Sequence, residues 1–178
     1  HRLIPFGNLR EPLGQLKRAD IIVLSKSNLG GFPEDIHIEQ FSEAPLHKAE
    51  IKAESFLLDK DKTKTPVHNY HNKTCVMVTS VGSPDGVAKI ADTMNLTVAT
   101  HLRFQDHHVY SQRDCNKINN TVKEKNGNYI LTTEKDIFKL CSVSGKNDVL
   151  SLSSEIYSLS VNFVFQDKTL DEICTQLY

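Results

Sequence analysis

Residues 98–114, VATHLRFQDHHVYSQRD, decide the fold that this sequence predicts. Apolar and polar residues alternate over residues 98–104, which is typical of a β-strand. Ser111 and Asp114 have the spacing of a capping box, which indicates that a helix begins there. The Asp-His-His of residues 106–108 stands between the two elements. Ligands of open α/β sheets bind at this edge, so we predict a functional loop here, with a solvated polar turn as the alternative.

The segments on either side repeat the alternation of strand and helix. Residues 75–80 and 129–132 are short apolar runs typical of buried strands. Ser83-Pro84 has the form of a helix start, with an N-cap followed by proline, and residues 133–136 form a second capping box. Asn126-Gly127 predicts a glycine C-cap at the end of the intervening helix.

The end of the chain predicts strands at residues 149–152 and 156–165 and a last helix capped by Thr169. Strands that alternate with helices, followed by an edge strand and a closing helix, predict an α/β fold. We expect a three-layer α/β/α sandwich with a mixed sheet.

The first part of the chain has a different pattern. A short helix is predicted at residues 12–18, a fully buried apolar strand at 21–24 and another strand at 51–58. Lysine and aspartate dominate the segment that follows, which predicts an exposed linker. We therefore predict that residues 1–48 are the end of an N-terminal domain, 49–73 an extended β linker and 74–178 a C-terminal α/β domain. Limited proteolysis should cut first between Asp59 and Asn72.

Composition excludes several classes of protein. A net charge of −1 gives no basic field, so we expect no nucleic-acid partner. The cysteines form no Cys-x-x-Cys pair, which favours buried thiols over zinc ligands or disulfides. No apolar run is long enough to span a membrane. The chain begins at His1 without an initiator methionine, which suggests a piece of a longer protein.

Arg10 and Glu11 are candidate site residues at the start of the first predicted helix. Arginine at a helix N-terminus can bind phosphate, and glutamate can hold Mg²⁺ or its waters. A surface ion pair that contributes little is the alternative.

A resemblance to a known family follows from motifs in a fixed order. Residues 3–12, LIPFGNLREP, are followed by KRAD at 17–20 and an apolar strand. TSVGSP at 79–84, FQDHH at 104–108 and TTEKD at 132–136, with Lys139 beyond it, come later. Together these motifs resemble the bacterial tetraacyldisaccharide 4′-kinase family over nearly the whole chain.

The resemblance implies a kinase of lipid A biosynthesis, peripheral at the cytoplasmic face of the bacterial inner membrane. Such an enzyme transfers the γ-phosphate of ATP to the 4′-hydroxyl of the glycolipid tetraacyldisaccharide 1-phosphate. The family binds ATP and Mg²⁺ through a glycine-rich P-loop and an acidic motif in its N-terminal half, where its membrane-docking region also lies. This chain contains neither motif. We therefore expect a fragment or a degenerate homologue, with no kinase activity on its own.

The family's site residues can be carried over at three positions. The resemblance makes His107 the residue that orients a catalytic aspartate supplied by the family's N-terminal half. It places Arg10 and Glu11 beside the nucleotide and metal, and we predict no metal ligand set within this chain. Asp106 and His108 are expected to shape the loop rather than react.

Two other functions remain open. One is a non-catalytic α/β binding module, because fold alone does not separate a kinase domain from such a module. The other is a DHH-type metal-dependent phosphoesterase, which needs an upstream Asp-x-Asp ligand pair after a strand. Asp59 and Asp61 lie instead in the lysine-rich segment.

Overall fold

The computed structural model describes residues 2–7, 9–30, 37–144 and 152–166. The chain forms two compact units, residues 52–162 and residues 1–51 together with 163–178. Two long strands, β2 (Leu46–Leu58) and β7 (Ile156–Phe165), contribute residues to both units. The larger unit includes most of the predicted linker, and the domain boundaries after residues 48 and 73 stay predictions.

Parallel strands form the centre of the larger unit. β4 (Thr74–Thr79), β5 (Thr97–Arg103) and β6 (Tyr129–Thr133) lie beside β7 in the order β7-β6-β4-β5. β4 pairs in parallel with both β5 and β6, and β6 with β7. The short strand β3 (Lys64–Pro66) runs antiparallel to β2, so the sheet is mixed, as predicted.

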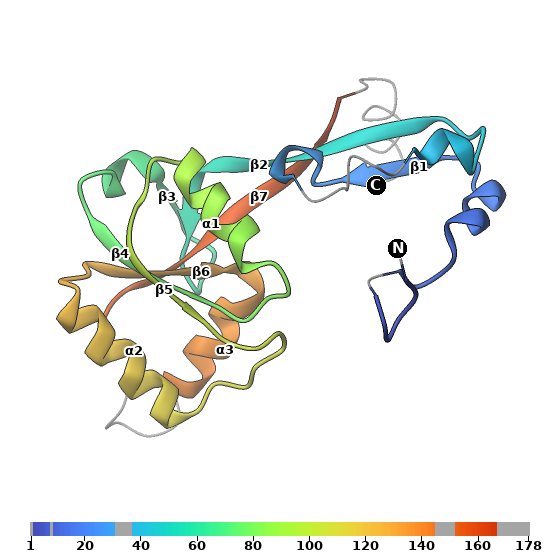
Figure 1. The fold of residues 1–178 in the computed structure, drawn as a ribbon. Helices are drawn as coiled ribbons and strands as arrows, with labels where there is room; N and C mark the ends of the chain where they lie inside the picture. The colour runs from blue at the N-terminus through green and yellow to red at the C-terminus, as the bar shows by residue number, and fades with distance from the viewer. Residues whose placement is uncertain (1, 8, 31–36, 145–151, 167–178) are drawn as a thin grey trace. The chain divides into compact units, whose positions relative to one another are not determined.

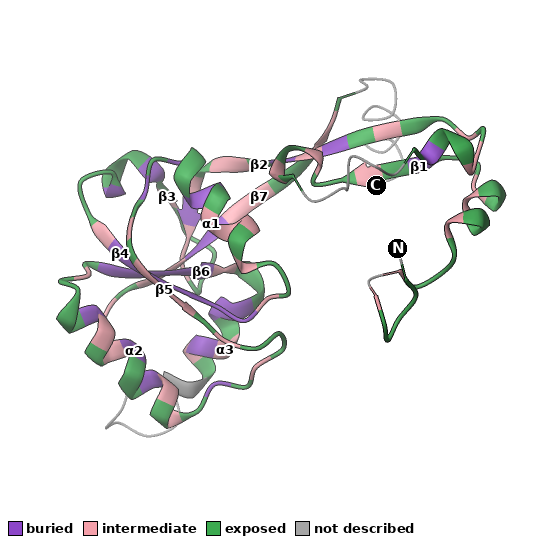
Figure 2. Ribbon diagram, in the orientation of Figure 1, coloured by how far each residue is buried: buried purple, intermediate pink, exposed green. Residues whose placement is uncertain are grey.

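Helices cover both faces of this sheet (Figure 1). α1 (Pro84–Thr93) lies on one face, and α2 (Gln112–Glu124) and α3 (Glu134–Ser144) lie on the other. β4 is buried along nearly its whole length because both of its faces are covered, which explains its uninterrupted apolar sequence. Figure 2 shows buried residues gathered on β4 and β6 and on the inward faces of the helices. The predicted three-layer α/β/α sandwich is confirmed.

Apolar stripes on the helices pack against the sheet to form the core. Cys115, Ile118 and Val122 of α2 pack with Val76 and Val78 of β4. α1 contributes Ile90 and Ala91, with Met94 directly after it, and all three are buried. Full burial of an aliphatic side chain of this size contributes about 1.5–3 kcal/mol, so this stripe can hold α2 on the sheet. Cys75 and Cys115 are buried free thiols, and burial raises the pKa of Cys75 to about 11.

The ends of the helices follow most of the predicted signals. Ser111 and Asp114 form the predicted capping box at the start of α2. At the other end Asn126, with φ of 52°, takes the left-handed conformation, and the Gly127 amide donates to the Val122 carbonyl at 2.8 Å. Gly127 avoids crowding instead, because a Cβ there would lie 3.2 Å from the Val76 side chain. Ser83 precedes α1 without a side-chain capping bond.

The smaller unit is built from short elements. It contains the 3₁₀-helices η1 (Leu13–Arg18), η2 (Ser27–Leu29) and η3 (Ile38–Gln40) and the strand β1 (Ile22–Ser25), parallel to β2. The prediction of a fully buried strand is wrong, because Ile22 is buried whereas Ile21 is 50% and Val23 is 46% exposed.

Two predicted elements cannot be compared with the structure. The helix after Thr169 lies outside the described residues, as do residues 149–151 of the strand predicted at 149–152. Leu152 is buried but belongs to no strand.

The segment predicted as an exposed linker is structured at its ends. Asp59 accepts hydrogen bonds from the amides of Asp61 and Thr63, which closes a turn before β3. The 3₁₀-helix η4 (Val67–Tyr70) buries both of its terminal side chains. Residues 60–63 between the two strands are all exposed and belong to no helix or strand.

Trypsin provides a test of the exposure of this turn. Within residues 52–142 we expect the earliest tryptic cut at Lys60 or Lys62, because these lysines lie in an exposed turn outside the strands. Mass spectrometry of a digestion time course identifies the cut. Earlier cleavage in α2, at Arg113 or Lys117, would contradict the prediction.

Candidate functional site

The candidate site lies at the carboxyl ends of the parallel strands in the larger unit. Ser80 follows β4, residues 104–110 follow β5, and Thr133 ends β6. Parallel strands bring their carboxyl ends to one edge of a sheet, which is where α/β proteins bind ligands. The loop with the Asp-His-His therefore lies where the sequence predicts.

A tight turn presents the two histidines. The His108 amide donates to the Gln105 carbonyl at 3.0 Å, and His107 has a left-handed φ of 61°. The Asp106 carboxylate accepts the His107 amide at 2.9 Å and lies 3.8 Å from Nε2 of the His107 ring. The His107 side chain is 78% exposed at the tip of the turn, so it can meet a group from outside this unit.

His108 fastens the turn to the domain. Its ring stacks on Phe104 with a centroid distance of 4.8 Å, and its Nε2 lies 3.1 Å from the carboxylate of Asp114. Tyr110 packs edge-on against both rings. His108 and Asp114 thus connect the turn to the capping box of α2. His108 therefore has a structural role, whereas the side chain of His107 projects outward.

Lys135 at the start of α3 reaches the same turn. Its Nζ donates to Oδ1 of Asp106 at 3.1 Å, and both side chains are about half exposed. This hydrogen bond holds the pKa of Asp106 below its ordinary value. The motifs at residues 104–108 and 132–136, which are far apart in the sequence, therefore meet at one carboxylate.

A buried ionic cluster lies next to this turn. The carboxylate of Asp136, which is fully buried, accepts the Ser80 amide at 2.8 Å and the Ser80 hydroxyl at 2.5 Å. Lys139 donates to the same carboxylate at 2.9 Å and to the Ser80 hydroxyl at 3.0 Å. Burial by itself would raise the pKa of Asp136, but the hydrogen bonds from Ser80 and the Lys139 ammonium outweigh it and hold the pKa below its ordinary value.

The sequence places Asp136 in a predicted capping box and Lys139 beside a family motif, but it does not predict that both meet Ser80. Asp136 and Lys139 are three residues apart on a predicted helix, and Ser80 directly follows a predicted strand. A spacing of three residues places Asp136 and Lys139 on one face of the helix, near the edge of the sheet. This spacing was the sequence signal from which their pairing could have been predicted. The capping role predicted for the start of α3 belongs to Thr133, whose hydroxyl interacts with the amide and carboxylate of Asp136.

Arg10 and Glu11 belong to the smaller unit, whereas His107 belongs to the larger one. Glu11 pairs with Arg18 at 3.0 Å, and both side chains are more than 60% exposed. An exposed pair of this kind contributes little to stability, so Glu11 remains available to another cation. The roles of Arg10 and Glu11 stay predictions.

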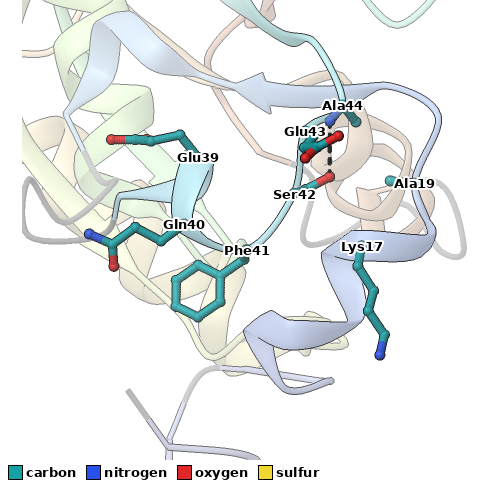
Figure 3. A pocket seen from close by; sticks show the side chains of 8 residues that line it. All are labelled: Lys17, Ala19, Glu39, Gln40, Phe41, Ser42, Glu43 and Ala44. Atoms are coloured by element: carbon teal, nitrogen blue, oxygen red, sulfur yellow. Dashed lines mark hydrogen bonds between the residues drawn. The ribbon is translucent and has the colours of Figure 1, made fainter.

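The smaller unit also has an open hollow of about 520 Å³ (Figure 3). It is lined by Lys17, Ala19 and residues 39–44. Its volume suits a small molecule, but such sites are usually enclosed and mainly apolar. Its lining includes the positively charged Lys17 and the negatively charged Glu39 and Glu43, whose side chains do not converge on one point in Figure 3. The hollow therefore does not identify a class of ligand.

The described residues do not form a metal centre. No group of three or more His, Cys, Asp or Glu side chains is arranged there to hold an ion. The second ligand set of a DHH-type phosphoesterase is therefore not found in that part of the chain. In the same residues, no helix is both long and apolar enough to cross a membrane.

The fold and the site define an α/β domain whose charged and histidine side chains gather at the carboxyl edge of a parallel sheet. The family model described as Tetraacyldisaccharide-1-P 4'-kinase matches residues 1–178. The chain belongs to this family, and the resemblance found in its motifs is confirmed.

Individual relatives agree with the family model. The chain is 30% identical to the tetraacyldisaccharide 4'-kinase of Bdellovibrio bacteriovorus over 99% of its own length and 52% of the relative's. For the kinase of Halothermothrix orenii the identity is 29%, over 78% of this chain and 40% of the relative. The chain therefore spans about half the length of the relatives it matches.

A solved structure has the same fold. The crystal structure of LpxK from Aquifex aeolicus in complex with ATP matches with a TM-score of 0.62 and 23% identity. The match covers 99% of this chain and 48% of the LpxK chain.

The buried cluster gives a pH-dependent prediction. We expect Asp136→Asn to lower the free energy of unfolding by about 2–4 kcal/mol at pH 7, because it removes the charge paired with Lys139 and weakens the bonds to Ser80. The folded-state pKa is lower than the unfolded one, so this stabilisation is complete above about pH 4 and is lost as the pH falls through the folded pKa. Urea denaturation from pH 3 to 7 measures both effects.

Asp85→Asn is the matched control. Asp85 pairs with Arg103 at 2.8 Å, but its side chain is 76% exposed. Its loss should cost less than about 1 kcal/mol at pH 7. Equal costs for the two substitutions would show that burial of Asp136 does not strengthen its interactions.

Proposed function

We propose that this chain forms part of an ATP-dependent kinase that phosphorylates the 4′-hydroxyl of tetraacyldisaccharide 1-phosphate. The observation that carries the proposal is the family match over residues 1–178, which includes the exposed His107 at the carboxyl edge of the sheet. The named activity of the relatives and the ATP bound to LpxK support it.

His107 is the residue of this chain closest to the chemistry in our proposal. A sugar hydroxyl is a weak nucleophile and must lose its proton as the phosphoryl group arrives. An imidazole that hydrogen-bonds to a carboxylate base can keep that base oriented towards the hydroxyl. The exposure of His107, together with the turn that fixes its backbone, suits contact with a carboxylate from another part of the enzyme.

ATP and Mg²⁺ bind mainly outside this chain in the proposal. The sequence has no glycine-rich phosphate loop, and the described residues have no acidic cluster suited to Mg²⁺. Arg10 and Glu11 are proposed to contribute a single cation and a single carboxylate beside the nucleotide. The residues described do not form a Mg²⁺ site by themselves.

We also propose that the enzyme works peripherally at the cytoplasmic face of the bacterial inner membrane. The supporting argument is the substrate, because a disaccharide with four acyl chains stays in a lipid layer. Membrane contact would come from the family's N-terminal half.

A chimaeric enzyme tests the proposed function. In the Bdellovibrio kinase, the segment matched by this chain is replaced with residues 1–178. Transfer of radiolabelled γ-phosphate from ATP to tetraacyldisaccharide 1-phosphate is then measured. We expect transfer well above that of the Bdellovibrio remainder alone, and a folded chimaera without activity would contradict the proposal.

The isolated chain should lack both kinase activity and strong nucleotide binding. Without a phosphate loop, Mg·ATP has no set of backbone amides to hold its phosphates. Isothermal titration calorimetry of the 178-residue chain with Mg·ATP should show a Kd well above the micromolar range. Micromolar affinity would mean that a nucleotide site exists within this chain.

His107→Ala tests the residue in the active chimaera. We expect kcat and kcat/KM to fall together, by about 10²-fold or more, because an orienting group acts mainly in the transition state. His108→Ala is the comparison, and its loss of contacts with Phe104 and Asp114 should lower the melting temperature more than kcat. A stable His107→Ala enzyme that turns over at the wild-type rate would end the assignment.

A further inference from the structure

We infer that Lys135 is a positioning residue, which keeps His107 in its working conformation by holding the Asp106 carboxylate. This inference rests on the proposed function of His107. Lys135 touches neither the imidazole of His107 nor any reacting group in the proposal, so its effect passes through Asp106.

The backbone at His107 needs support. A φ of 61° is in the left-handed region, which residues other than glycine enter at a cost, although histidine enters it more often than most. The turn supplies one restraint, the bond from the His108 amide to the Gln105 carbonyl. The second restraint is the bond from the His107 amide to Asp106. Left-handed residues kept in place by their surroundings are frequent at functional sites.

A single oxygen of Asp106 carries both interactions. Oδ1 accepts the His107 amide at 2.9 Å and the Lys135 ammonium at 3.1 Å. The carboxylate is 43% exposed, so without Lys135 it can turn to water and leave the amide. Gly82 lies on its other side, since a Cβ there would be 3.4 Å from Oδ2. The carboxylate is therefore held between the loop after β4 and the first turn of α3.

The backbone of Lys135 is held in place by its neighbour in the chain. The next residue, Asp136, is fully buried and bonded to the amide and hydroxyl of Ser80. This bond fixes the first turn of α3 against the end of β4. An exposed ion pair such as Lys135–Asp106 adds little to stability, so its effect should appear in geometry and turnover rather than in melting temperature.

The test combines NMR on the 178-residue chain with kinetics in the active chimaera. In Lys135→Ala we expect the His107 amide signal to shift and its HN–Hα coupling, which reports φ, to change. We expect kcat to fall about tenfold or more with little change in KM, because a displaced orienting group loses alignment in the transition state. Lys135→Arg keeps a cation in reach of Asp106 and should restore both readouts. Glu134→Ala, an exposed neighbour in the same turn, should change neither.

Asp106→Ala and the double variant show whether the pair acts as a unit. Asp106→Ala should lower kcat at least as much as Lys135→Ala. The double variant should be no slower than Asp106→Ala alone, because the two residues act through one interaction. Additive losses would overturn the inference, since Lys135 would then act by another route.

The outcomes separate this inference from the proposed function. An unchanged His107 amide signal in Lys135→Ala overturns the inference whatever the activity. Wild-type turnover by Lys135→Ala, in an enzyme that His107→Ala inactivates, overturns it while the proposed function stands. Wild-type turnover by His107→Ala overturns both.

Discussion

The buried carboxylate of Asp136 is the interaction on which the candidate site depends. It accepts both the amide and the hydroxyl of Ser80, and Lys139 balances its charge. A buried carboxylate without these partners would be very unfavourable, so the end of β4 and the start of α3 must stay together whenever the group is ionised. One ionic cluster thereby fixes the start of the loop after β4 against the first turn of α3.

Buried groups fix the backbone of the site, and exposed groups orient the His107 side chain. Asp136 and Ser80 are fully buried, whereas Asp106 and Lys135 are about half exposed and His107 is 78% exposed. The buried bonds contribute stability, and the exposed ones set the direction of a side chain that must remain accessible. The proposed contact of His107 with another part of the enzyme needs both, because a fully buried histidine could not reach its partner.

Sequence patterns predicted the larger unit well because its signals are local. Strand periodicity, the capping box at Ser111 and the helix stripes depend on neighbours in the chain, and all are present in the structure. The prediction that β1 is fully buried was wrong, because the apolar run at residues 21–24 gives no information on whether another element covers the strand. The cluster of Ser80, Asp136 and Lys139 was missed because its bonds join residues 56 and 59 positions apart. The left-handed residue after α2 was assigned to Gly127 because glycine is the commonest choice, although asparagine also tolerates that conformation.

In the function proposed above, the distribution of charges at this sheet edge implies that nucleotide binding and orientation of the base are carried out by different parts of the enzyme. Here Lys135 and Lys139, two lysines near this edge, are each paired with an aspartate. These ammonium groups hold protein carboxylates in place. A phosphate would have to displace the carboxylates in order to bind the same ammonium groups. Phosphoryl transfer needs cations and backbone amides aimed at the phosphates. The described edge offers instead an exposed imidazole on a restrained turn, which suits contact with a base. Binding of the nucleotide and orientation of the base would then be separable, so damage to this edge should slow turnover without weakening the affinity for ATP.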